Sequence, residues 1–187
     1  MSLIAGNLGA VQRLLDNAEL PWGVCAGSAA YLYGVRRPIK NVDILLPQGC
    51  LRQVRDILKK NRLTAQYDGR ILLWRGIKIF DDLTVNINGV RYPFLMDDPM
   101  QEHLRRLPLL GVRALIVAPE DVVAHKSLLI IGDSKPGKHH REDFDAIIRR
   151  QGERLDKDYL AQRLDICQAR LQVQHLFTET AISLPNP

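Results

Sequence analysis

The sequence predicts an α/β protein in which short strands and helices alternate and a run of helices follows. Apolar residues near the N-terminus repeat with the spacing of an amphipathic helix, short apolar runs recur up to residue 95, and helical patterns take over after residue 118. With 187 residues, of which 46% are hydrophobic, the chain is long enough to bury one core. We therefore expect an α/β core over residues 1–118 and a helical segment over residues 119–187 that packs on it as a single structural unit.

The first part of the chain opens with a predicted helix that ends before Pro21. Its apolar face is formed by Ile4, Leu8, Val11 and Leu15. Beyond it, the pattern predicts a strand over residues 24–26, a helix over 28–33, a basic loop over 36–40, a strand over 42–46 and a helix around 51–58. Residues 71–95 are expected to be rich in strands, with a tight hairpin turn at Asn88-Gly89, because both residue types tolerate positive φ.

A helical region begins at Pro119, because proline suits the first turn of a helix and carboxylates such as Asp121 complement its dipole. This helix is expected to reach Ile131 and to break over residues 132–137. A second helix is predicted over residues 142–150. One further helix is predicted to carry Leu160, Leu164, Cys167 and Leu171 on a single face.

The composition favours a cytoplasmic protein. The three cysteines are widely spaced, without the pairing of a metal site, which fits a reducing compartment. No apolar run approaches the roughly 20 residues that span a bilayer, and no basic stretch precedes a long apolar segment at the N-terminus, so neither a membrane partner nor a secretory signal is expected. The net charge of +5 is compatible with anionic partners such as nucleotides, and equally with a solvated basic surface.

Gly27 and Ser28 follow the first predicted strand and open the next helix. Glycine lets a ligand approach the backbone closely, and a helix N-terminus presents N–H groups to an anion. The Ser28 hydroxyl can add a further hydrogen bond. The pair therefore predicts a phosphate-binding turn, although a turn made of small residues for packing alone has the same appearance.

Asn41 and Asp43 lie two residues apart at the second predicted strand, so both are expected on one face while Val42 and Ile44 face the core. A polar pair on an otherwise apolar strand needs a partner, and Mg²⁺ prefers oxygen ligands. Asp43 suits that role. The alternative is that Asp43 bonds a nearby loop.

A further acid has two candidate sources. Asp82, in the pair Asp81-Asp82, follows a predicted strand, and Asp97-Asp98 follows another. Aspartates are common before loops for reasons of turn chemistry alone. We select Asp82, with the second pair as its rival.

Together these motifs resemble the nucleotidyltransferase superfamily, including its minimal and toxin–antitoxin members. The resemblance extends from Trp22 to Gly152 and implies a nucleotidyltransferase-like fold, a short mixed β-sheet flanked by helices. It also implies Mg²⁺ held by three acids and ATP or another nucleoside triphosphate as substrate. By position, Asp43 and Asp82 would be catalytic metal ligands together with Asn41, which stands where the family has its first aspartate.

The same resemblance includes the helix that begins at Pro119 and carries Lys126, followed by a helix with Asp143 and Asp145, and it implies that Asp143 pairs with Lys126 or braces the helix. It implies that Lys126 binds a phosphate together with Gly27 and Ser28. The alternatives are a surface lysine for Lys126 and a carboxylate that stabilises the start of a helix for Asp143.

Two functional hypotheses follow. In the first, the protein transfers a nucleoside monophosphate from a Mg²⁺-bound triphosphate to a hydroxyl on a small molecule, protein or RNA. Because Asn41 replaces a metal-binding acid, this turnover is in question. In the second, a degenerate nucleotidyltransferase fold binds a nucleotide, an RNA or a protein partner, in an antitoxin-like or regulatory role.

Overall fold

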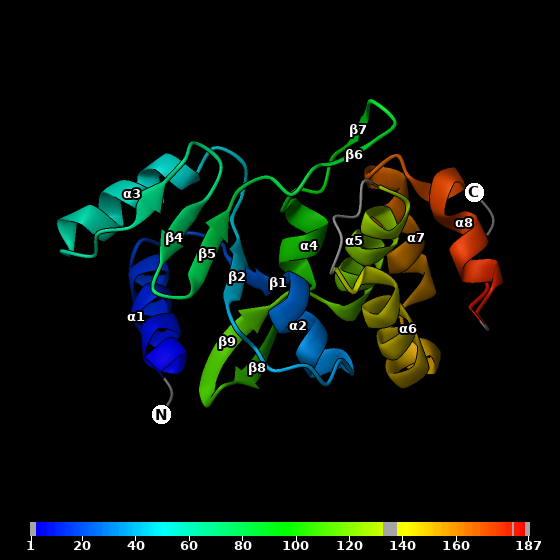
Figure 1. Cartoon of the computed structure of the whole chain (residues 1–187), viewed down its shortest axis with the longest axis horizontal. Helices are drawn as coiled ribbons and strands as arrows, with labels where there is room; N and C mark the ends of the chain where they lie inside the picture. Colours follow the sequence, from blue (N-terminus) through cyan, green and yellow to red (C-terminus); the bar gives the residue numbers. More distant parts are fainter. Residues whose placement is uncertain (1–2, 133–137, 181, 186–187) are drawn as a thin grey trace. The chain divides into compact units, whose positions relative to one another are not determined.

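A computed structural model describes residues 3–132, 138–180 and 182–185 of the chain, which is drawn in Figure 1. The chain divides into two compact units. The first comprises residues 1–28, 38–83 and 95–117, and the second comprises residues 29–37, 84–94 and 118–187. Most of the predicted break at 132–137 lies outside the described residues. Packing of the segment after residue 118 on the core remains a prediction.

The first unit is built on a seven-stranded mixed sheet, in the order β3-β4-β5-β2-β1-β9-β8. The strands are β1 (Gly23–Cys25), β2 (Val42–Leu45), β3 (Gln66–Tyr67), β4 (Leu72–Trp74), β5 (Ile77–Phe80), β8 (Arg105–Leu109) and β9 (Val112–Ile116). β2 runs parallel to β5 and β1 runs parallel to β9, whereas the other neighbours are antiparallel. The predicted mixed α/β fold is therefore confirmed.

One face of this sheet forms the core of the first unit. Val24, Ile44, Ile79 and Leu72 stand in one row across the four strands β1, β2, β5 and β4, and all four are fully buried. Helix α1 (Leu3–Asn17) packs against β5, β9 and helix α3 (Leu51–Lys60). Burial of such a row fixes the register, because a slip of one residue would bring the other set of side chains to this face.

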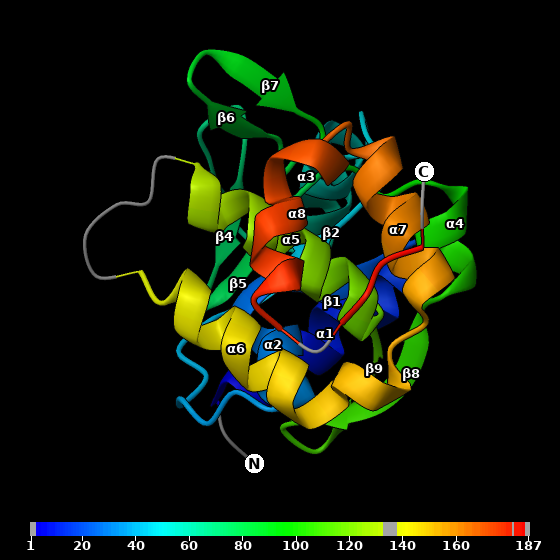
Figure 2. The same ribbon diagram turned by 90° about the vertical axis from the view of Figure 1, so that its right-hand side faces the viewer.

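The second unit is a group of helices around α5 (Pro119–Ile131), whose residues 119–128 are all buried. Figure 2 shows the three helices that contact it: α6 (His140–Gln151), α7 (Lys157–Ile166) and α8 (Arg170–Thr178). A hairpin of β6 (Val85–Ile87) and β7 (Val90–Tyr92) and the short 3-10 helix η1 (Gly152–Arg154) belong to the same unit. Helix α2 (Ala26–Tyr33) begins in the first unit and continues in the second.

Several predicted elements are confirmed, and one is wrong. The hairpin turn has positive φ at Asn88 and Gly89, 51° and 84°. The single helix predicted to include residues 160–171 is in fact α7 and α8, because Gln168 has a φ of 56° and ends the first of them. Leu171 is consequently 77% exposed and does not share the buried face of Leu160.

The β8–β9 hairpin and the short helix α4 (Asp98–Glu102) were not predicted from the sequence. The hairpin turns at Leu110 and Gly111, both with positive φ, and leucine at such a position gives no turn signal. Among the described residues, no helix combines the length and the apolar character needed to cross a membrane.

Candidate functional site

The strand order brings the predicted Gly27-Ser28 turn and Asp43 to one end of the sheet in the first unit. β1 is antiparallel to β2, with Cys25 opposite Asp43, so the carboxyl end of β1 lies beside the amino end of β2. β2 is parallel to β5, with Asp43 opposite Lys78. Gly27, Asn41, Asp43 and Lys78 are therefore at or near the same sheet end, which we call the α2 edge.

The turn from β1 into α2 is open to a ligand at Gly27. Ala26 has a φ of 50°, which sends the chain directly from strand into helix. Gly27 is exposed, and a side-chain carbon added there would meet nothing within 4 Å. Because the first N–H groups of a helix have no acceptor within it, an anion can approach them at this position.

The Ser28 hydroxyl has a structural partner. Its Oγ donates to the backbone carbonyl of Asn41 at 2.8 Å, and the residue is only 2% exposed. A hydroxyl has one proton to donate, so this bond ties α2 to the segment that leads into β2. The predicted hydrogen bond from Ser28 to a phosphate would require this bond to break, whereas its backbone N–H is unaffected.

Asn41 lies one residue before β2, and its side chain is exposed. Asp43 lies within β2 and is half-buried, while Val42 and Ile44 are fully buried on the opposite face as predicted. Of the predicted pair Asn41 and Asp43, only Asp43 belongs to the strand, so only its side-chain direction is fixed by the strand. The position across from it in β5 is a lysine, Lys78, also half-buried.

Asp82 does not lie beside Asp43. β5 ends at Phe80, and Asp82 comes four residues after Lys78, so its Cα is displaced along the strand direction by roughly 13 Å if the chain stays extended. The adjacent Asp81 accepts the N–H groups of Gly49 and Leu51 at 3.0 and 3.3 Å, at the start of α3. The Asp81-Asp82 pair is therefore at the sheet end opposite to the α2 edge.

The rival Asp97-Asp98 pair has a capping role. The Asp97 carboxylate accepts the N–H of Met100 at 3.0 Å and caps α4. Neither candidate pair thus supplies an acid that the register places next to Asp43.

The donor set at the α2 edge does not fit the Mg²⁺ site that the fold family implies. Mg²⁺ is bound through carboxylates, water and substrate phosphates. Within the described ranges, no three His, Cys, Asp or Glu side chains are close enough together to hold a metal ion. Of the described residues, the register places one carboxylate at this edge, Asp43, with Lys78 as its cross-strand neighbour and Asn41 two residues before it.

In the second unit, Lys126 and Asp143 form a buried ion pair. Nζ of Lys126 lies 2.7 Å from Oδ2 of Asp143, and Arg37 donates to the other carboxylate oxygen. Burial, followed by the charge of Lys126, lowers the pKa of the nearby His140 to about 4. Two cations thus share one carboxylate in this cluster, and Asp143 braces Lys126 instead of only stabilising the start of a helix.

A second buried pair was missed by the pattern analysis. Nε of Arg163 lies 2.8 Å from Oδ1 of Asp121, and both side chains are 0% exposed. The Tyr159 hydroxyl donates to the same carboxylate at 3.0 Å, and the Ala118 N–H donates at 3.2 Å. Burial raises the pKa of Asp121 to about 7, while the charge of Arg163 and these hydrogen bonds oppose the rise. The helix-start role predicted for Asp121 is correct but incomplete, because nothing local in the sequence indicates Arg163 as its partner.

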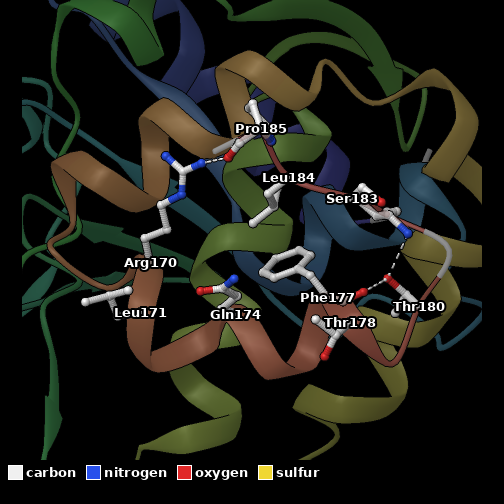
Figure 3. Close-up of a pocket in the computed structure, with 10 residues that line it drawn as sticks. Arg170, Leu171, Gln174, Phe177, Thr178, Thr180, Ser183, Leu184 and Pro185 are labelled. Carbon is white, nitrogen blue, oxygen red and sulfur yellow. Dashed lines mark hydrogen bonds between the residues drawn. The ribbon is translucent and has the colours of Figure 1, made fainter. Parts of the chain in front are cut away.

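A cavity of about 340 Å³ in the second unit contains none of the predicted site residues (Figure 3). It lies between α8 and residues 182–185, with Phe177 and Leu184 on its wall. Its charged lining residue, Arg170, forms an ion pair with Asp165 and donates a hydrogen bond to the carbonyl of Pro185. We therefore place the candidate site at the α2 edge and not in this cavity.

Comparison with solved structures identifies the fold. The chain is similar to the solution structure of the antibiotic-resistance factor ANT(2'')-Ia, with a TM-score of 0.58, 11% identity and 94% coverage of each chain. It is also similar to the crystal structure of ANT(2'')-Ia in complex with adenylyl-2''-tobramycin, with a TM-score of 0.59, 11% identity, and coverage of 93% of this chain and 99% of that chain. No family model and no curated protein matches the sequence. The two similar structures are of a nucleotidyltransferase, and the chain therefore has a nucleotidyltransferase-like fold.

Proposed function

We propose that this protein is a nucleotide-binding module with a nucleotidyltransferase-like fold, which binds a nucleoside triphosphate at the α2 edge without transferring a nucleotide. The observation that carries the proposal is the pairing of Asp43 with Lys78 across β2 and β5. The α2 edge therefore combines a turn that is open to a phosphate with a strand pair that carries one carboxylate.

Phosphate binding is supported by the geometry at Gly27. The glycine is exposed, faces open space and belongs to the first turn of α2. Backbone N–H groups at such a terminus, together with the helix dipole, favour an anion. Because ANT(2'')-Ia has been crystallised with adenylyl-2''-tobramycin, we choose ATP as the nucleotide to test and a hydroxyl-rich antibiotic as the first acceptor.

Nucleotide transfer is disfavoured by the donor set. In the two-metal mechanism, acids hold the ions that activate the attacking hydroxyl and stabilise the leaving pyrophosphate. Loss of one such electrostatic contact costs about 3 kcal/mol in the transition state, or roughly a hundredfold in rate. Here Asn41 removes one charge and the register displaces Asp82 from Asp43, so we expect no turnover.

The binding experiment is calorimetric titration of ATP into the wild-type protein and into Gly27→Val. The added side chain would fill the open space at α2, and affinity should fall at least about tenfold, because a phosphate could no longer approach the backbone. Gly6→Val is the matched control, because Gly6 is an exposed glycine in α1 that also meets nothing within 4 Å. Absence of ATP binding to the wild type, or equal affinities for both variants, would overturn the proposal.

The transfer experiment uses labelled ATP, Mg²⁺ and an aminoglycoside, with Asp43→Ala as the comparison. No incorporation above background is expected for either protein. Incorporation that depends on Asp43 would instead establish the enzyme of the first hypothesis. The predicted phosphate contact of Lys126 stays a prediction, and Lys126→Met in the calorimetric titration tests it.

A further inference from the structure

The position of Lys78 next to Asp43 is set by packing and not by chance contact of flexible side chains. The flanking residues Ile77 and Ile79 are fully buried, and they pair with Val42 and Ile44, which are also fully buried. A one-residue slip of β5 would bury the lysine and expose both isoleucines. Cross-strand partners share a face, with Cβ atoms roughly 5 Å apart, so the ammonium and the carboxylate are held on the same side of the sheet.

Lys78 is available to an anion. With the described residues its side chain forms no ion pair and no hydrogen bond. On the same face its neighbours are Leu73 in β4, which is 38% exposed, and Phe80 two residues further along β5. A cation beside such apolar side chains is less well solvated than one in open water, which strengthens its attraction for a phosphate.

The same charge acts against a divalent cation. An ion bound by Asp43 would share this face of the sheet with the ammonium group of the neighbouring Lys78, and the two positive charges would repel each other. A phosphate at the first turn of α2 would instead be attracted by both the helix terminus and the ammonium. Compared with an edge that carries two carboxylates, this edge is therefore less favourable to a metal ion and more favourable to an anion.

We propose that Lys78 takes the place of a divalent cation at this edge and binds the phosphates of the nucleotide directly, so that binding is independent of Mg²⁺. This inference rests on the proposed nucleotide-binding function and specifies the form of the ligand: the free nucleoside triphosphate, not its Mg²⁺ complex. Because Mg²⁺ neutralises two charges of the triphosphate, the complex binds more weakly than the free nucleotide.

The test is calorimetric titration of ATP in EDTA and in excess Mg²⁺. Wild-type protein should bind at least as tightly in EDTA as in Mg²⁺. Lys78→Met should bind about tenfold more weakly in EDTA, the effect of losing one charge-assisted contact. Lys78→Arg should retain Mg²⁺-independent binding, and Lys59→Met, which removes an exposed lysine of α3, should match the wild type.

A charge reversal provides the sharpest comparison. Lys78→Glu places a second carboxylate beside Asp43, and its ATP binding should require Mg²⁺, the opposite of the wild-type dependence. Thermal unfolding of each variant checks that the fold is intact. Wild-type binding that requires Mg²⁺, or equal affinities of Lys78→Met and wild type in EDTA, would overturn this inference and leave nucleotide binding itself standing. Failure of the wild type to bind ATP in both buffers would overturn the proposed function, and this inference with it.

Discussion

The two units of this protein place their charged residues in different environments. In the first unit, Asp43 and Lys78 are half-buried cross-strand neighbours at the α2 edge. In the second, Arg163 and Asp121 are fully buried and 2.8 Å apart. A buried ion pair is stable only when both partners are present, because burial of either ion alone has a large desolvation cost. The charges of the second unit therefore serve the packing of its helices, whereas the Lys78 side chain at the α2 edge is not ion-paired with any described residue.

If the α2 edge binds the nucleotide as we propose, charge density by itself is a poor guide to the functional site. The second unit holds more ionisable contacts, including the pairing of Lys126 and Arg37 with Asp143. The Lys126–Asp143 pair joins α5 to α6, Arg37 joins the residues after α2 to α6, and the Asp121 network joins α5 to α7. The edge of the first unit has fewer charges, but they stand beside an open helix terminus.

The largest effect is expected from breaking the buried pair of the second unit. Arg163→Met should lower the free energy of unfolding by about 3 kcal/mol, because Asp121 would remain buried without its cation. Chemical denaturation measures the difference. The double variant Asp121→Leu/Arg163→Met should recover part of the loss, since no uncompensated charge is left although the Tyr159 hydroxyl and the Ala118 N–H lose their acceptor.

The corresponding break in the first unit, Lys78→Met, should change the free energy of unfolding by less than about 0.5 kcal/mol, because the lysine is half-buried and is not ion-paired with the described residues. A loss in Lys78→Met as large as that in Arg163→Met would contradict the distinction between the two units. So would an Arg163→Met protein as stable as the wild type.

A smaller effect is expected from His125 in α5, which should lower the free energy of unfolding by about 2 kcal/mol at pH 5. Its ring stacks on Phe94 with centroids 4.5 Å apart, and burial, followed by the charge of Lys126, lowers its pKa from 6.5 to about 3. Below pH 6.5 the unfolded chain binds a proton that the folded protein does not, so His125 destabilises the fold progressively as the pH falls toward 3. His125→Phe keeps a ring against Phe94 and should lose this dependence.

The measurement is the difference between the unfolding free energies of wild type and His125→Phe at pH 7.5 and pH 5. Asp121 acts in the opposite direction, because its raised pKa favours the folded state as the pH falls from 7 to 4. Both proteins contain Asp121, so its contribution cancels in the difference. An identical pH dependence of the two proteins would mean that His125 is not held neutral by burial.

An effect smaller than that of His125 is expected from two buried serine hydroxyls, one in each unit. Ser28 Oγ donates to the Asn41 carbonyl at 2.8 Å, and Ser127 Oγ donates to the Ala124 carbonyl at 2.7 Å. Ser28→Ala and Ser127→Ala should each cost about 1 kcal/mol of unfolding free energy. In ATP titrations neither should change the affinity more than about threefold, because the Ser28 proton is already used. A tenfold loss confined to Ser28→Ala would show that this hydroxyl binds phosphate.

Much of the local structure was predictable, because periodicity and turn chemistry are properties of neighbouring residues. The helical spacing of Leu8, Val11 and Leu15 corresponds to α1, and the helix predicted from Pro119 to Ile131 matches α5. The sequence pattern failed where a single residue overrides periodicity, as at Gln168, whose positive φ separates α7 from α8. A residue in the left-handed region leaves no trace in the hydrophobic pattern.

The sequence alone determined the kinds of elements, the glycine-serine turn at the start of α2 and the position of Asn41 two residues before Asp43. Only the tertiary structure decided which side chains meet. It placed Lys78, not Asp82, beside Asp43, and it joined Asp121 to Arg163. The physical reason is that strand register and helix packing are selected by burial of apolar residues distant in the chain, and the polar side chains are carried to their neighbours by that choice.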